Sequence, residues 1–237
     1  MSIQVILFDL DGTLLPMDQD VFAKYYFGLL SKKIAPLGYE PETFVGAIWK
    51  GTAEMVKNTG EKTNEEIFWN TFASIFGEKA KADEPHFNTF YREDFDKVAV
   101  SCGKNEKAAE VIALCKQKGF RTVLATNPIF PAIATQKRVA WAGLSVSDFE
   151  LITTYENSHS CKPNPAYYQE ILKKLGVKAE NCLMVGNDVR EDMVAETLGM
   201  KVFLLTDCII NKDGVDISRY PNGNFDELME FIKNLKV

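Results

Sequence analysis

The sequence predicts an α/β protein in which a doubly wound parallel sheet carries an inserted α-helical domain. Short apolar runs such as VILF at 5–8 are typical of strands that are buried on both faces of a parallel sheet. Beyond residue 104 such runs alternate with amphipathic helices, which favours a sheet covered by helices. About eighty residues separate the first strand from this alternating part, whereas a strand-to-helix connection usually takes about two to six. We therefore assign residues 1–16 and 99–237 to the α/β core domain and residues 17–98 to the inserted helical domain.

The insert follows the first strand, which we expect at residues 4–10, and it shows no buried-strand pattern of its own. Turn-forming stretches at 35–41 and 57–66 divide it into helices, and Thr63 or Asn64 is suited to cap the helix after the second turn. Its aromatic and aliphatic residues at helical spacing are Phe22, Tyr25, Tyr26, Leu29, Leu30, Ile67, Phe68, Phe72, Ile75 and Phe76. We interpret them as the core of the insert rather than as a wall on which a substrate stacks.

The rest of the chain alternates regularly between strands and helices. Strands are expected at 121–126, 149–155, 182–186 and 201–205. Helices are expected at 105–118, about 131–141, 164–176, 190–198 and 225–235. A glycine closes three of these helices, at positions 119, 176 and 199, and Pro165 stands in the first turn of another.

Composition excludes several function classes. The 237 residues include 33 acidic and 27 basic ones, for a formal net charge of −6, so we expect neither nucleic acid nor an anionic membrane as a partner. No apolar run approaches the roughly 20 residues of a membrane span, and the N-terminal run stops at Asp9, unlike a signal peptide. The five cysteines form no C-x-x-C pair, which favours a reducing cytoplasm over a disulfide or zinc framework. Nothing in the pattern predicts an oligomeric state.

Two aspartates, Asp9 and Asp11, end the first apolar run. Because residues i and i+2 of a strand point to the same side, both carboxylates are expected to face one pocket at the carboxyl end of the strand. Gly12 allows a sharp turn there, and Thr13 offers a hydroxyl. Two carboxylates so close repel each other unless they share a proton or a cation. The alternative is a D-x-D-G turn that only ends the strand.

Other strand ends carry complementary groups. Thr126 and Asn127 end the second expected strand, Lys162 follows the third, and Asp188 and Asp192 follow the fourth. Ligands of open parallel sheets bind at the carboxyl ends of the strands, so these side chains are expected to meet. Mg²⁺ prefers carboxylate oxygens, while an ammonium and a hydroxyl suit phosphate oxygens. The sequence therefore predicts a site for Mg²⁺ and a phosphoryl group.

Four motifs in this order resemble those of the haloacid dehalogenase-like hydrolase superfamily. They are D-x-D-G-T at 9–13, T-N at 126–127, K-P-x-P at 162–165 and G-x-D-x-x-x-D at 186–192. The resemblance covers residues 3–18 and about 100–206. It implies a Rossmann-like core, and the helical insert after the first motif looks like the type-1 cap of that superfamily.

The resemblance implies a role for each motif residue. Asp9 would be the nucleophile that forms an aspartyl-phosphate, and Asp11 the general acid and then the general base. Asp9, the backbone carbonyl of Asp11 and Asp188 would hold Mg²⁺. Many relatives have an acid where Asn187 stands, so the metal ligand is assigned to Asp188, and a contribution of Asn187 stays open.

The remaining motif residues would bind phosphate or support the site. Thr126 and Lys162 would hold the phosphate oxygens, with Asn127 as a further candidate close to the phosphate. Asp192 would support the site by holding Lys162 or a metal-bound water.

These roles imply a cytoplasmic Mg²⁺-dependent phosphatase that acts on a small phosphorylated metabolite. The presence of Asp11 favours phosphoester chemistry over dehalogenation, because a halide needs no proton when it leaves. A sugar-phosphate phosphomutase of the same superfamily would share every one of these core residues. A phospho-aspartate signalling module and a catalytically silent relative are further alternatives, although the insert over the site and the intact motif set argue against them.

Overall fold

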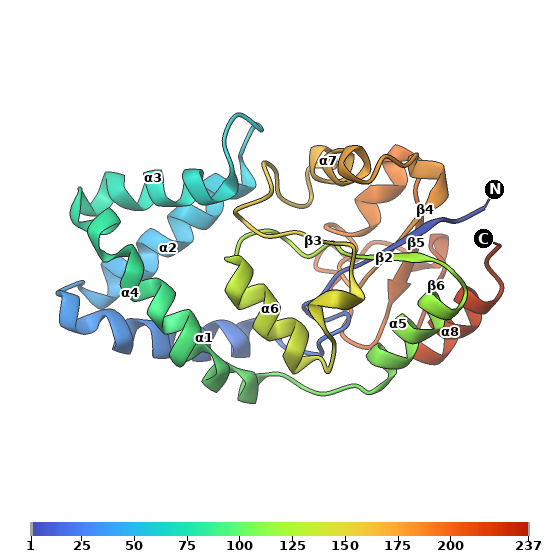
Figure 1. The fold of residues 1–237 in the computed structure, drawn as a ribbon, viewed down its shortest axis with the longest axis horizontal. Coiled ribbons are helices and arrows are strands. Elements are labelled where there is room, and N and C mark those ends of the chain that lie inside the picture. Colours follow the sequence, from blue (N-terminus) through green and yellow to red (C-terminus); the bar gives the residue numbers. More distant parts are fainter. Residues whose placement is uncertain (1, 237) are drawn as a thin grey trace.

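The structure is a computed structural model that describes residues 2–236, and its centre is a six-stranded, fully parallel sheet (Figure 1). The strands are β1 (Val5–Phe8), β2 (Arg121–Leu124), β3 (Leu151–Ile152), β4 (Cys182–Gly186), β5 (Lys201–Leu205) and β6 (Asn222–Gly223). Their order in the sheet is β3-β2-β1-β4-β5-β6, so the chain changes direction of winding between β1 and β4. This confirms the predicted doubly wound sheet and places the end of β1 at the switch point, where such sheets bind ligands.

Helices cover both faces of the sheet, as the near-continuous apolar strands require. Ile6 and Phe8 of β1 pack on the side of α5 (Lys107–Gln117) and α8 (Phe225–Lys233). Val5 and Leu7 point to the opposite side, where they pack near α7 (Pro165–Leu175). The same division is visible in Figure 1, where α5 and α8 lie on one side of the strands and α7 on the other. All four side chains are fully buried, which fixes β1 at the centre of the core domain.

Several predicted elements differ in extent from those in the structure. The strand expected at 149–155 pairs with β2 only over Leu151–Ile152, because Asn157 bonds the Ile152 carbonyl and the Thr154 amide and so turns the chain. The helix expected at 190–198 is confirmed only in part: a 3₁₀ helix forms over Met193–Leu198, and Gly199 closes it as expected. The side chain of Asp188 bonds the amides of Arg190 and Glu191, which holds this segment in tight turns. The two-residue β6 escaped prediction because it is polar and exposed at Asn222.

The insert forms a helical unit at the carboxyl edge of the sheet (Figure 1). Its helices are α1 (Gln19–Ile34), α2 (Pro41–Val56), α3 (Asn64–Phe76) and α4 (Lys79–Glu93), and a 3₁₀ helix over Phe95–Ser101 leads back to the core. The unit has an aromatic core of its own, as expected, but Tyr25 and Ile75, which were assigned to that core, are exposed. Thr63 rather than Asn64 caps α3, through a reciprocal pair of bonds with Glu66.

The insert is joined to the core at one place and docks at another. The amide of Gly103 donates to the carbonyl of Pro16 at 2.7 Å, so the segment that enters the insert and the segment that leaves it lie side by side. The fully buried Asn64 at the start of α3 donates from its amide nitrogen to the carbonyls of Pro128 and Ser160. These contacts hold the insert over the strand ends, and the exact domain limits at 16/17 and 98/99 stay a prediction.

Among the described helices, none has both the length and the apolar character that a membrane crossing requires.

Candidate active site

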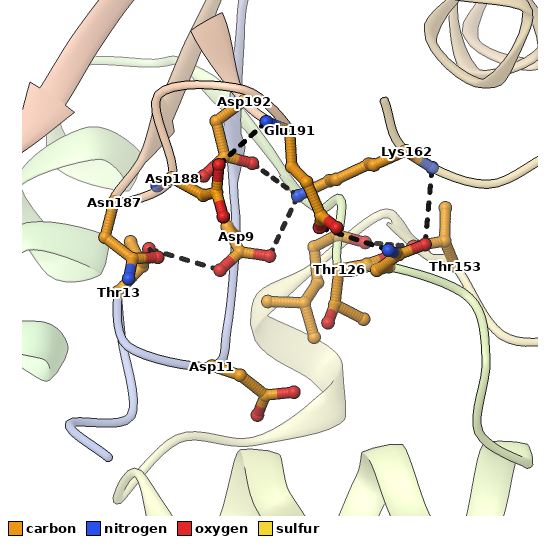
Figure 2. Close-up of polar contacts among 12 residues, drawn as sticks. Asp9, Asp11, Thr13, Thr126, Thr153, Lys162, Asn187, Asp188, Glu191 and Asp192 are labelled. Carbon is orange, nitrogen blue, oxygen red and sulfur yellow. Dashed lines mark hydrogen bonds and ion pairs between the residues drawn. The ribbon is translucent and has the colours of Figure 1, made fainter. Parts of the chain in front are cut away.

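A buried ion network lies at the carboxyl end of β1 (Figure 2). The ammonium of Lys162 donates to Asp9 Oδ1 at 2.8 Å and to Asp192 Oδ1 at 2.6 Å, and each of the three residues is at most 7% exposed. Burial alone lowers the pKa of Lys162, but the carboxylates of Asp192 and Asp9 raise it well above its ordinary value. Lys162 is therefore a cation, and a buried cation of this kind is stable only when it is paired. The structure brings Lys162, Asp9 and Asp192 together, as the strand-end argument predicts.

Asp192 serves this network from the turn after β4. Its second oxygen, Oδ2, accepts from the backbone amide of Asp188 at 2.9 Å, so both oxygens are engaged. The carboxylate lies directly over Gly186, where a Cβ would come within 2.1 Å of Asp192 Oδ2. Glycine in this motif is thus required by close approach of a side chain, and Asp192 holds Lys162, as one of the two expected alternatives states.

Thr13 and Asn187 flank Asp9 on the other side (Figure 2). The Thr13 hydroxyl lies 3.2 Å from Asp9 Oδ2 and 2.9 Å from Asn187 Oδ1. The amide nitrogen of Asn187 donates to the carbonyl of Cys208 at 2.7 Å. Both ends of the Asn187 amide are thus used in bonds that hold loops together, and Asn187 also lines the cavity, so a contribution to a metal site stays a prediction. Gly12, at a φ of 84°, lies so close to Asn187 that a Cβ would come within 2.4 Å of its amide nitrogen.

Asp188 lies beside Asp9 and faces the same cavity (Figure 2). One of its oxygens, Oδ1, accepts from the backbone amides of Arg190 and Glu191 at 2.8 and 2.9 Å. Among residues 2–236, no group of three or more acidic, histidine or cysteine side chains is arranged to hold a metal ion. Mg²⁺, however, is commonly bound by only one or two carboxylates together with water and substrate phosphate. The carboxylates of Asp9 and Asp188 fit a site of that kind.

Asp11 faces away from this network, although it lines the same cavity (Figure 2). Its Oδ2 forms an ion pair with the guanidinium of Arg138, a fully buried residue of α6 (Ala132–Trp141) that also lies over the ring of Phe130. Asp11 Oδ1 is buried without a hydrogen-bond partner among the described residues. Burial raises the pKa of Asp11, and the Arg138 charge opposes this shift. No sequence pattern pointed to Arg138, because it is one basic residue within an ordinary amphipathic helix.

Thr126, Asn127 and Glu191 complete the polar floor. The carbonyl of Thr126 accepts from the hydroxyls of Thr153 and Tyr167 at 2.7 and 2.9 Å, which fixes the residue at the cavity. Asn127 donates to Glu191 Oε2 at 3.1 Å and accepts from the Lys162 amide at 3.3 Å. Burial raises the pKa of Glu191 to about 7, with the Lys162 charge opposing. No expectation from the sequence pointed to Glu191, which occupies an unspecified position of the fourth motif and gains its place only through the tight turn after β4.

One cavity of about 250 Å³ joins these groups. Its floor contains Asp9, Asp11, Thr126, Asn127, Asp188, Glu191 and Asp192, and its walls come from the helices of the insert. Lys162 lies beneath the floor, in contact with Asp9. The arrangement combines a fixed carboxylate, a buried ammonium behind it and further acids around one shared cavity, which suits covalent chemistry on a carboxylate oxygen.

Comparison with known proteins agrees with this site. A family model described as haloacid dehalogenase-like hydrolase matches residues 3–195, which include all four motifs. The protein therefore belongs to the haloacid dehalogenase-like hydrolase family, and the resemblance found in the sequence is confirmed.

The individual relatives described next share between 17% and 32% sequence identity with this chain. The glyceraldehyde 3-phosphate phosphatase of Methanothermobacter thermautotrophicus is 24% identical over 204 residues, which cover 76% of this chain and 89% of that one. The phosphoglycolate phosphatase of Colwellia psychrerythraea is 32% identical over 122 residues, or 51% of this chain and 52% of that one. A crystal structure of a HAD phosphatase from Thermococcus onnurineus superposes with a TM-score of 0.60 at 17% identity, covering 99% of this chain and 100% of that one, and supports the fold.

Proposed function

We propose that this protein is a Mg²⁺-dependent phosphatase that hydrolyses a small phosphorylated metabolite in the cytoplasm through an aspartyl-phosphate on Asp9. The observation that carries the proposal is the position of Asp9. Its carboxylate lines the cavity floor between the Lys162 ammonium and the Thr13 hydroxyl. Relatives that are named as phosphatases support the reaction class.

In this proposal Asp9 attacks the phosphorus atom of the substrate. A bond forms between a carboxylate oxygen and phosphorus while the bond to the leaving oxygen breaks. Lys162 stays within 2.8 Å of Asp9 and offsets negative charge on the phosphoryl group, and Asp192 positions Lys162. The Thr126 hydroxyl and the Asn127 amide are candidates to donate to the other phosphate oxygens, since both residues line the cavity.

Asp11 acts as the general acid and then as the general base. Burial raises its pKa, which favours the protonated form that the leaving oxygen needs. The resulting carboxylate then takes a proton from the water that attacks the aspartyl-phosphate, and inorganic phosphate leaves. Because Asp11 is paired with Arg138, the proposal requires its carboxyl to turn from α6 toward the phosphate during turnover.

The donor set of the floor supports Mg²⁺ as the cofactor of this reaction. When bound, Mg²⁺ would be held by Asp9, Asp188 and the backbone carbonyl of Asp11, and it would supply positive charge against the phosphate. Only one oxygen of Asp188 is engaged by the Arg190 and Glu191 amides, so its other oxygen is suited to this role.

The test compares Asp9→Asn with the matched control Asp207→Asn, an exposed aspartate that does not line the cavity. With p-nitrophenyl phosphate and Mg²⁺ we expect repeated turnover for the native protein and the control. Asp9→Asn should lose at least about 1,000-fold in kcat, because the attacking oxygen is gone. Unchanged activity of Asp9→Asn would overturn the assignment of the nucleophile.

Two further readouts separate the alternatives. A single stable phosphorylation without turnover would indicate a phospho-aspartate switch. Conversion of a hexose 1-phosphate to the 6-phosphate, without release of phosphate, would indicate a phosphomutase.

A further inference from the structure

The wall of the cavity differs in chemistry from its floor. Ten aromatic side chains line the cavity, contributed by α1, α2, α3, α4 and the loops of the core. Phe27, Trp49, Phe68 and Trp69 are only partly buried or exposed, so they present ring surface that the insert does not use for its own packing. The interpretation of the insert's aromatic residues as core is therefore incomplete, because some of them also form this wall.

Among residues 2–236, no basic side chain lines the cavity, so none could face a second anionic group there. Every charged side chain that lines it among the described residues is acidic: Asp9, Asp11, Asp188, Glu191 and Asp192. The two buried cations of the site are already paired, Lys162 with Asp9 and Asp192, and Arg138 with Asp11.

The polar groups of the wall are neutral. The hydroxyls of Tyr26 and Tyr91 bond each other at 2.7 Å, and burial raises the pKa of Tyr26 to about 12, so it stays uncharged. The other polar wall residues of the insert, Gln19, Thr52 and Asn88, are uncharged as well.

The aromatic wall and the lack of a basic lining residue both favour a substrate whose leaving group is uncharged. A carboxylate or second phosphate placed against the wall would lose water without gaining a counter-charge, and it would face the acidic floor. An uncharged ring would instead bury apolar surface against aromatic faces. The cavity volume of about 250 Å³ is near the lower end of small-molecule sites, which favours a leaving group no larger than one ring.

We propose that the substrate class is a phosphomonoester of an uncharged, largely apolar alcohol of about one ring, and that the enzyme discriminates against esters with a second anionic group. This inference rests on the proposed phosphatase function and specifies its substrate. It separates this protein from a phosphatase acting on phosphoglycolate, the compound for which one of its relatives is named.

The test uses three phosphate esters of primary alcohols, so that leaving-group chemistry is similar. Benzyl phosphate carries the ring, ethyl phosphate is the small neutral reference, and 2-phosphoglycolate adds a carboxylate to a two-carbon group. We expect kcat/KM to fall in the order benzyl, ethyl, glycolate, with benzyl phosphate preferred to phosphoglycolate on the order of 100-fold. Turnover of phosphoglycolate equal to or faster than that of ethyl phosphate would overturn the substrate class while leaving phosphatase activity intact.

A binding measurement keeps the two proposals distinguishable. Benzylphosphonate carries the ring and phosphonoacetate carries the carboxylate. Neither compound is an ester, so the enzyme cannot hydrolyse them. In calorimetry, benzylphosphonate should bind at least about 10-fold more tightly than phosphonoacetate. If no ester is turned over, the proposed function fails, and the relative affinity of the two phosphonates still decides whether the cavity selects an uncharged ring.

Trp49→Ala tests the wall directly, because Trp49 lines the cavity yet is 54% exposed, so its removal leaves little void in the core. The matched control is Tyr25→Ala, a 46% exposed aromatic residue of α1 that does not line the cavity. Trp49→Ala should lower kcat/KM for benzyl phosphate about fivefold and leave ethyl phosphate within about twofold. An equal effect on both esters, or no effect on either, would contradict the proposal.

Discussion

The floor and the wall of the cavity are built from opposite kinds of side chain. On the floor, Asp9, Lys162 and Asp192 form a buried ion network in which each polar atom has a fixed partner. On the wall, aromatic rings from the insert pack at centroid distances of about 5–6 Å, as between Phe27 and Trp49 at 5.2 Å. Hydrogen bonds demand specific atoms at specific distances, whereas ring packing tolerates many side chains of similar size.

This difference suggests a division of labour in the enzyme. The floor comes from the core domain, and its residues coincide with the family motifs. The wall comes mainly from the insert, where no motif was found. We infer that the reaction depends on the floor and the choice of substrate on the wall, and the following predictions can break or sharpen that division.

The largest effect is expected for Lys162→Met. Removing the ammonium leaves Asp9 and Asp192 buried without their shared counter-charge, so the free energy of unfolding should fall by about 3–5 kcal/mol. Phosphatase activity should fall below detection. Urea unfolding and p-nitrophenyl phosphate assays measure the two effects.

The double variant Lys162→Met with Asp192→Asn is the control for this substitution. It removes one of the two unpaired charges, so it should regain part of the stability and none of the activity. Wild-type activity in either variant would show that the ion network is not part of the reaction.

Removal of the metal should abolish the reaction at the floor of the cavity and leave binding at the wall unchanged. EDTA is expected to abolish turnover and added Mg²⁺ to restore it, while benzyl alcohol, which carries the ring but no charge, still quenches tryptophan fluorescence through Trp49 and Trp69 in EDTA. Asp188→Asn should raise the Mg²⁺ concentration needed for half-maximal activity by about 10- to 100-fold. Full activity in EDTA would remove Mg²⁺ from the proposed mechanism.

Arg138→Met tests the general acid. The Arg138 charge opposes the rise that burial causes in the pKa of Asp11, so its removal should raise that pKa further. The protonated acid then persists to higher pH, and the alkaline limb of the kcat/KM profile should move upward. Arg138→Lys keeps the charge and should leave the limb close to that of the native protein. A limb that does not move in Arg138→Met would argue against Asp11 as the acid.

The smallest effect is expected on the wall. Tyr26→Phe removes one partner of the buried hydroxyl pair with Tyr91, which should cost about 1 kcal/mol in the free energy of unfolding. Because the ring remains, kcat on p-nitrophenyl phosphate should change less than about twofold. A loss of kcat comparable to that of the floor variants would end the division between reaction and specificity.

Most of the fold and the motif residues can be predicted from the sequence. The apolar runs of the strands, the glycine ends of helices such as Gly176, and the order of the four motifs are local or periodic features, so they can be found without coordinates. The prediction failed where side chains set the local geometry. Asp188, for example, holds the start of the expected helix at 190–198 in tight turns.

The sequence by itself determined which residue types stand at the carboxyl ends of the strands, because strand position and alternation follow from nearest neighbours along the chain. Only the tertiary structure decided which of them share a partner. Asp11 and Arg138 are 127 positions apart, and their pairing depends on how α6 packs against the first loop. The same holds for the place of Glu191 beside Asn127 and for the aromatic wall. No local pattern encodes these contacts, because they arise only when separate elements are packed together.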